Sequence, residues 1–184
     1  MQSDHHNADL LKSRLTTLAL EREIHKRVED LVLCGVRPKI IYQVIERKFS
    51  IPEVKRIHNY LSPVRASARH GRNVKASTAD ELPLATQSIY VECFSLVAQA
   101  IGLGATRPDA LSAAWRILAG KYGFQPHESF RGCRCEEMIV LFLNVEVGEL
   151  HVKGCDVCNT TSISSSAWHC VSCASAQKLL KRVA

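Results

Sequence analysis

The chain has 184 residues, of which 46% are hydrophobic and 23% are charged, and its formal net charge at pH 7 is +6. These values are typical of a folded globular protein and exclude a disordered chain, a collagen-like repeat and a coiled-coil rod. The longest apolar run covers only residues 138–143, and the N-terminus lacks the basic and apolar segments of a signal peptide. We therefore expect a cytoplasmic protein that does not enter a membrane.

The first predicted element is a helix over residues 8–33, which Gly35 ends. Its apolar residues form two offset stripes, Leu11, Leu15 and Leu18 in one and Leu20, Ile24, Val28 and Leu31 in the other. One helix seldom hides that much apolar surface against a single neighbour. The second stripe therefore packs either on the central helices or on a partner protein.

Two short helices follow within residues 37–61. Pro38 suits the first turn of a helix in which Ile40, Ile41, Val44 and Ile45 recur at helical spacing. Ser50 and Glu53 then have the spacing of a capping box at the start of the next helix. Two short helices with a tight turn between them are typical of a helix-turn-helix.

The second of these helices carries the candidate DNA contacts. Val54, Ile57 and Leu61 are spaced to pack inward, which leaves the polar side chains on or beside the outer face. Arginine and lysine bind phosphate or guanine, and asparagine pairs with adenine. The predicted contacts to double-stranded DNA are Lys55, Arg56, His58 and Asn59 in this helix and Arg65, Arg69, Arg72 and Lys75 after it.

Charge is concentrated in the same part of the chain. Residues 37–75 hold ten basic and two acidic residues, a net charge of +8, so the rest of the chain sums to about −2. Such concentration is expected of an electrostatic footprint for phosphates. The structural alternative is a plain helical hairpin with a solvated basic surface.

The remaining chain divides into three regions. Residues 63–83 predict a basic linker, or an arm that becomes ordered on DNA, because they lack apolar periodicity. Residues 84–104, 107–123 and 135–150 predict helices, although the β-branched content of the last also allows a strand. The expected fold is mostly α. It consists of an N-terminal helical domain with the helix-turn-helix (1–62), the linker (63–83), a helical domain (84–150) and a zinc-binding region (151–184).

Six of the eight cysteines lie in the last 52 residues. Cys155 and Cys158, then Cys170 and Cys173, form two C-x2-C pairs separated by eleven residues, the spacing of a four-cysteine zinc ribbon. Four thiolates fill a tetrahedral shell, so we expect one structural zinc ion per chain. Disulfides or a redox pair fit this spacing less well.

The remaining cysteines and the two histidines near the zinc motif are not expected to be the main metal ligands. His151 and His169 could replace a ligand but are expected at the surface or behind the ligands. Cys133 and Cys135 are interpreted as ordinary thiols, and Cys34 and Cys93 as core residues. The sequence has no nucleophile elbow, metalloprotease motif, Walker loop or deaminase signature, so we do not expect an enzyme.

The combination of a helix-turn-helix, a helical middle and a four-cysteine knuckle resembles FlhC, the zinc-binding subunit of bacterial FlhDC-type transcription activators. The likeness includes LVLCGVRPKIIYQVIERKFSIPEVKRIHNYLSP, YVECFSLVAQAIGLGATRPDALSAAWRIL and LFLNVEVGELHVKGCDVCN. It implies the same four cysteine ligands, a hetero-oligomer with a small helical FlhD-like partner, and activation through RNA polymerase. FlhC-like proteins also serve conjugative elements, so the expected targets are promoters of flagellar or conjugative-transfer genes.

Two other functions remain open. A zinc-ribbon protein that binds RNA would prefer structured RNA to duplex DNA. A non-catalytic interaction scaffold would use the basic stretch to bind an acidic protein.

Overall fold

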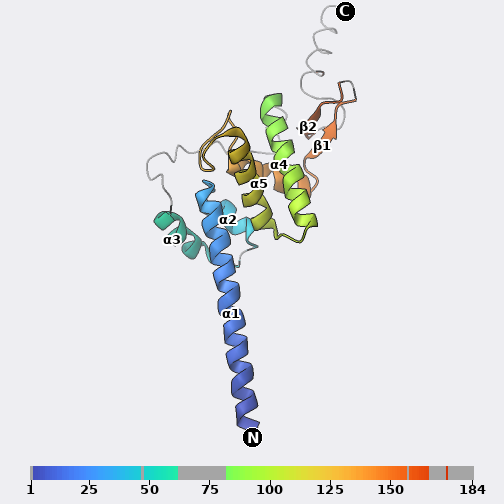
Figure 1. Ribbon diagram of the computed structural model, residues 1–184. Helices are drawn as coiled ribbons and strands as arrows, with labels where there is room; N and C mark the ends of the chain where they lie inside the picture. Colours follow the sequence, from blue (N-terminus) through green and yellow to red (C-terminus); the bar gives the residue numbers. More distant parts are fainter. Residues whose placement is uncertain (1, 47, 62–81, 157, 166–172, 174–184) are drawn as a thin grey trace, which may run out of the picture.

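The computed structural model describes residues 2–46, 48–61, 82–156, 158–165 and 173, with side chains from residue 16 onward. Within these residues it contains six helices and one two-stranded sheet (Figure 1). The helices are α1 (Gln2–Leu33), α2 (Pro38–Val44), α3 (Ile51–Leu61), α4 (Leu84–Gly102), α5 (Arg107–Tyr122) and α6 (Cys135–Glu146), and the strands are β1 (His151–Gly154) and β2 (Thr161–Ser164). The predicted mostly-α fold is confirmed, and the segment that could have been a strand is helix α6.

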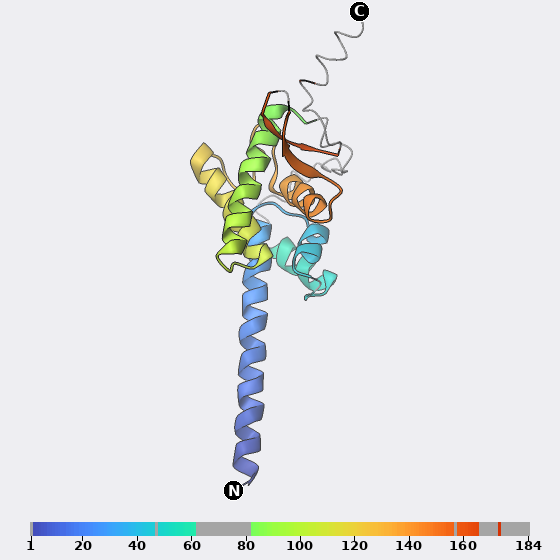
Figure 2. The ribbon, with the colours of Figure 1, turned by 90° about the vertical axis from the view of Figure 1, so that its right-hand side faces the viewer.

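Helix α1 extends well beyond the other helices toward the N-terminus (Figures 1 and 2). Its C-terminal part packs on the body through the buried side chains of Ile24, Val28, Leu31 and Val32. The helix ends before Gly35, as predicted. Gly35 has a φ of +76°, and a Cβ there would lie 3.1 Å from the carbonyl oxygen of His127. Glycine is therefore the residue that fits this turn without strain.

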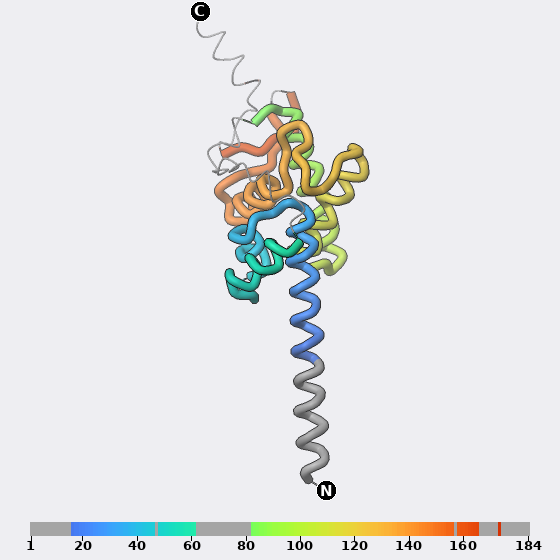
Figure 3. Tube along the Cα trace, turned by 90° about the vertical axis from the view of Figure 1, so that its left-hand side faces the viewer, coloured from blue at the N-terminus to red at the C-terminus, as the bar shows by residue number. Residues whose placement is uncertain are grey.

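Helices α2 and α3 pack against each other and against α1, and α2 also contacts α6 (Figure 3). The predicted inward residues of α3 are buried at Val54 and Ile57 and half-buried at Leu61. The predicted capping box is confirmed. The backbone N–H of Ser50 donates to Glu53 Oε2 at 2.8 Å, and the N–H of Glu53 donates to Ser50 Oγ at 3.4 Å.

The core lies between α4, α5 and α6 and continues into the N-terminal helices. Its largest fully buried side chains include Tyr90, Trp115 and Met138, and the indole N–H of Trp115 donates to the carbonyl oxygen of Pro126 at 2.7 Å. Val28 and Ile41 belong to the same hydrophobic cluster. Buried residues of the predicted regions 1–62 and 84–150 thus share one core.

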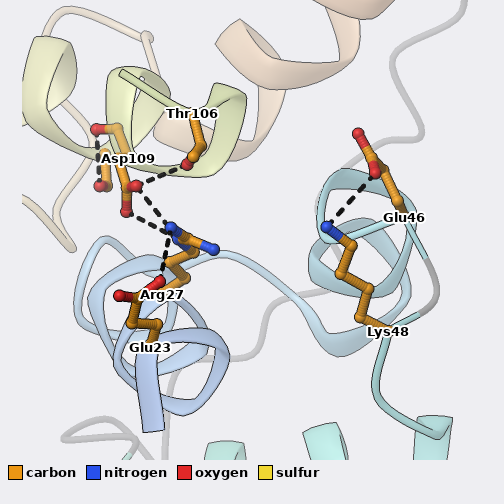
Figure 4. A network of polar contacts seen from close by, with 7 residues as sticks. Glu23, Arg27, Glu46, Lys48, Thr106 and Asp109 are labelled. Atoms are coloured by element: carbon orange, nitrogen blue, oxygen red, sulfur yellow. Dashed lines mark hydrogen bonds and ion pairs between the residues drawn. The ribbon is translucent and has the colours of Figure 1, made fainter. Parts of the chain in front are cut away.

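An ion pair fixes α1 to the start of α5. Arg27 Nε lies 3.0 Å from Asp109 Oδ2 and 3.3 Å from Asp109 Oδ1, and the Thr106 hydroxyl also donates to this carboxylate (Figure 4). Glu23 lies on the other side of the Arg27 guanidinium, at 3.5 Å. Arg27 therefore joins two helices that are far apart in the sequence.

Among the described residues, α4 is long and apolar enough to cross a membrane by length and composition alone. Its face with Ile89, Tyr90, Cys93, Phe94 and Val97 is buried within the fold. The buried helix of a folded core commonly has this composition, and α4 packs against α5 and β2 in that way.

Candidate metal centre and nucleic-acid interface

The first C-x2-C pair lies in the turn between β1 and β2. The strands pair antiparallel, with Gly154 opposite Thr161, so residues 155–160 form the turn. The N–H of Cys155 donates to the carbonyl oxygen of Thr160 at 3.0 Å, and the N–H of Asn159 donates to that of Cys155 at 2.7 Å. Asn159 has a φ of +56°, a conformation that asparagine tolerates better than most residues. These hydrogen bonds hold Cys155 and Cys158 in one tight turn, the knuckle between the strands.

The structure brings three of the four predicted ligands together. The Sγ atoms of Cys155, Cys158 and Cys173 all lie within 4.8 Å of one another. Cys155 is buried, Cys173 is half-buried and Cys158 is exposed. Cys170 and His169 lie outside the described residues, and His151 is an exposed residue of β1 that is not part of the cluster.

This cluster could hold a metal ion. A tetrahedral zinc ion with Zn–S bonds of about 2.3 Å keeps its sulfur ligands about 3.8 Å apart, which the observed spacing allows. Sulfur ligands favour zinc and other thiophilic metals over magnesium or calcium. The Cys158 thiol donates to the Thr160 hydroxyl oxygen at 3.3 Å, and with Cys158 as a metal-bound thiolate the same hydroxyl would donate to the sulfur.

The outer face of α3 presents three of the four predicted DNA contacts in that helix. Lys55, Arg56 and Asn59 are exposed, opposite the buried Val54 and Ile57. His58 is half-buried, and this burial lowers its pKa, so the imidazole is neutral at pH 7. Its position beside the buried face makes His58 a poorer candidate than its neighbours.

Tyr60, which the sequence analysis did not single out, is 88% exposed at the end of the same helix. It follows Arg56 by four residues, so the two occupy neighbouring positions on the helix surface. An exposed tyrosine can both stack and donate a hydrogen bond.

The local charges leave the outer face of α3 positive. The Ser50 hydrogen bonds lower the pKa of the Glu53 carboxyl, so the one acidic side chain of α3 is ionised and engaged in the cap. Among the described residues, no carboxylate forms an ion pair with Lys55 or Arg56. Arg37, by contrast, pairs with Glu136 and is not available to a ligand in the same way.

The four remaining predicted contacts, Arg65, Arg69, Arg72 and Lys75, lie outside the described residues, as does most of the predicted linker. No protein-family model matches the chain, and no curated protein shows significant similarity to it.

Proposed function

We propose that this chain is the DNA-binding subunit of a transcription activator that acts with a small helical partner. The observation that carries the proposal is the outer face of α3, where Lys55, Arg56 and Asn59 are exposed together on a well-capped helix. A helix of this kind fits the major groove of B-DNA, where lysine and arginine bind guanine or phosphate and asparagine binds adenine. Helix α2 and the turn before Ser50 would complete a helix-turn-helix.

The resemblance to the FlhC family extends the proposal to partners and targets. The partner would be a small FlhD-like helical protein, and the complex would recruit RNA polymerase to promoters of flagellar or conjugative-transfer genes. The exposed Leu18 on the projecting part of α1 supports a helical partner, since an apolar side chain on a lone helix favours association.

The metal in this proposal is one structural zinc ion per chain, bound by Cys155, Cys158 and Cys173 with Cys170 as the fourth ligand. Four thiolates leave no open position for water, so the ion would cross-link the chain and would not take part in catalysis. The hydrogen-bonded knuckle that contains Cys155 and Cys158 supports the proposal, because it keeps two of the proposed ligands within one tight turn.

Genome-wide occupancy of the tagged chain in its own host tests the proposal. We expect enrichment at a limited set of promoters, with co-recovery of a small helical protein. Recovery of RNA, or an absence of enriched duplex sites, would exclude the DNA-binding function and favour an RNA-binding protein or a scaffold.

Variants of α3 then test whether this helix contacts bases, with a duplex taken from one of the enriched promoters as the binding target. Arg56→Ala and Asn59→Ala should each cost about 1–3 kcal/mol on this duplex and little on a scrambled one, if each reads a base. Lys55→Ala should weaken binding to both and lower the slope of log K against log salt by roughly one if it contacts phosphate. Lys153→Ala, an exposed lysine of β1, is the matched control. If Lys153→Ala alone impairs binding, the hairpin contacts DNA and α3 does not.

A further inference from the structure

The cysteines that the structure gathers into one cluster differ in exposure. Cys155 is buried, Cys173 is half-buried and Cys158 is exposed, although their Sγ atoms all lie within 4.8 Å of one another. A reagent in solution therefore reaches the sulfur of Cys158 before it reaches those of Cys155 and Cys173. Groups that touch the Cys158 sulfur thus have a direct influence on how the cluster reacts.

Thr160 lies against this sulfur because the turn between β1 and β2 bends back on itself. The N–H of Asn159 donates to the carbonyl oxygen of Cys155 at 2.7 Å, and Asn159 has a φ of +56°. The Asn159 side chain lies over Gly154, where a Cβ would be 3.4 Å from Asn159 Oδ1. This conformation brings Thr160 back to the knuckle, with its Oγ1 3.3 Å from Cys158 Sγ.

Thr160 contacts the two cysteines of the pair through different atoms. Its carbonyl oxygen accepts the N–H of Cys155 at 3.0 Å, whereas its hydroxyl contacts the sulfur of Cys158. The contact with Cys155 uses the backbone and is kept when the side chain is changed. The contact with Cys158 requires the hydroxyl. A substitution at this one position therefore separates the two contacts.

The Thr160 hydroxyl suits either state of the Cys158 sulfur. A threonine hydroxyl both donates and accepts, so it accepts from a neutral thiol and, after rotation about its C–O bond, donates to a thiolate. A hydrogen bond to a metal-bound thiolate stabilises the negative charge and fixes the orientation of the ligand. It also withdraws electron density from the sulfur, which makes the sulfur a weaker nucleophile.

We propose that Thr160 is a positioning residue of the metal centre, whose hydroxyl donates to the Cys158 thiolate, strengthens metal retention and protects this exposed ligand from electrophiles. The inference rests on the proposed function, in which Cys158 is a zinc ligand. It goes beyond that function because it assigns the control of the exposed side of the centre to a residue that is not itself a ligand.

Competition for zinc between the full chain and a chromophoric chelator measures metal retention. Thr160→Val removes the hydroxyl but keeps the branched shape of the side chain, and it should raise the Kd for zinc about ten-fold, the lower end of the loss typical for groups behind metal ligands. Thr160→Ser keeps the hydroxyl and should restore most of the affinity. Thr161→Val is the matched control, because Thr161 is the exposed neighbour that pairs with Gly154, and it should leave the Kd unchanged.

Cobalt in place of zinc gives a readout that a change in stability alone does not move. The sulfur-to-cobalt charge-transfer band should shift to lower energy in Thr160→Val, because the Cys158 sulfur loses its hydrogen bond and holds its electrons less tightly. The band should stay in place in Thr160→Ser and Thr161→Val. An unshifted band in Thr160→Val would overturn the proposed hydrogen bond to the thiolate.

N-ethylmaleimide tests the protection of Cys158 in the zinc-loaded chain. The sulfur forms a C–S bond with one alkene carbon, and the other carbon takes a proton from water. We expect Cys158 to be modified before Cys155 and Cys173, and several-fold faster in Thr160→Val than in Thr161→Val. The rate should rise in proportion to the maleimide concentration, since the reagent attacks the bound ligand. A rate independent of that concentration, or earlier modification of Cys155 or Cys173, would overturn the protective role.

Failure of this inference is distinguishable from failure of the proposed function. A natural chain that binds no zinc would remove the metal centre and this inference together. Equal zinc affinity of Thr160→Val and Thr161→Val would overturn the role of Thr160 alone. A Thr160→Ser variant that behaves like Thr160→Val would do the same, because the hydroxyl would not be the group that matters. None of these results depends on whether α3 binds DNA.

Discussion

Gln87 shows how one buried polar side chain positions the metal-binding hairpin. Its amide nitrogen donates to the carbonyl oxygen of Leu82 at 2.9 Å, and its Oε1 accepts the backbone N–H of Ile163 at 3.0 Å. The side chain is fully buried in α4, and Ile163 is fully buried in β2. Because a buried N–H without a partner is costly, Gln87 fixes the hairpin to α4 in one register.

We predict that Gln87→Leu destabilises the protein by about 1–3 kcal/mol, because the N–H of Ile163 and the carbonyl of Leu82 lose their partner. The measurement is urea-induced unfolding of the metal-loaded chain. Gln99→Leu is the matched control, since Gln99 is exposed on the same helix and bonds only weakly to Ser95. Equal stability of the two variants would show that Gln87 is not a structural link.

At the scale of elements, α1 has two parts with different environments. Of the predicted second stripe, Ile24, Val28 and Leu31 are buried against the body, whereas its first member, Leu20, is exposed. All residues from 16 to 23 are exposed, including Leu18 at 53% and Leu20 at 51%. Isolated helices in water are only marginally stable, so this projecting part gains most from a partner.

We predict that Leu18→Gln weakens recovery of the helical partner while changing the unfolding free energy of the chain by less than about 0.5 kcal/mol. Leu20→Gln, a matched change on another side of the helix, should have a smaller effect, because Leu20 continues the stripe that faces the body. Co-purification from the native host and urea unfolding measure the two quantities. Undiminished partner recovery with both variants would place the partner elsewhere.

At the scale of the whole molecule, the C-terminal hairpin is stabilised in two places, where its strands join the core and in the turn between them. Ile163 and Leu150 are buried in the common core, whereas the turn at residues 155–160 is stabilised by its own hydrogen bonds and by the proposed metal. Structural zinc typically contributes on the order of 10 kcal/mol to the folding of such sites. Removal of the metal should therefore act first on the turn.

We predict that a chelator exposes the amide hydrogens of Cys155 and Asn159 to exchange, while the N–H of Ile163 stays protected by Gln87. Metal analysis should give one zinc per chain, with loss in Cys155→Ser, Cys158→Ser, Cys170→Ser and Cys173→Ser. Cys133→Ser and Cys135→Ser are the controls and should keep the metal. If either control loses zinc while Cys170→Ser retains it, the ligand assignment is wrong.

Local patterns in the sequence predicted the helices and much of the candidate sites. Ser50 and Glu53 act within one turn of a helix, and the spacing of Cys155 and Cys158 fits one tight knuckle, so neighbouring residues alone carry these signals. The burial of Cys34 and Cys93 and the inward face of α3 were also predicted correctly. The helix-turn-helix and the DNA contacts stay predictions.

Contacts between distant residues could not be read from such patterns. Periodicity tells which side of a helix is apolar but not which neighbour covers it or where that neighbour ends. The sequence by itself thus determined the helical elements, the concentration of positive charge and the cysteine knuckle, because each depends on residues close in the chain. Only the tertiary structure decided that His58 is half-buried, that Leu18 is uncovered and that Arg37 pairs with Glu136, because each depends on how separate helices pack together.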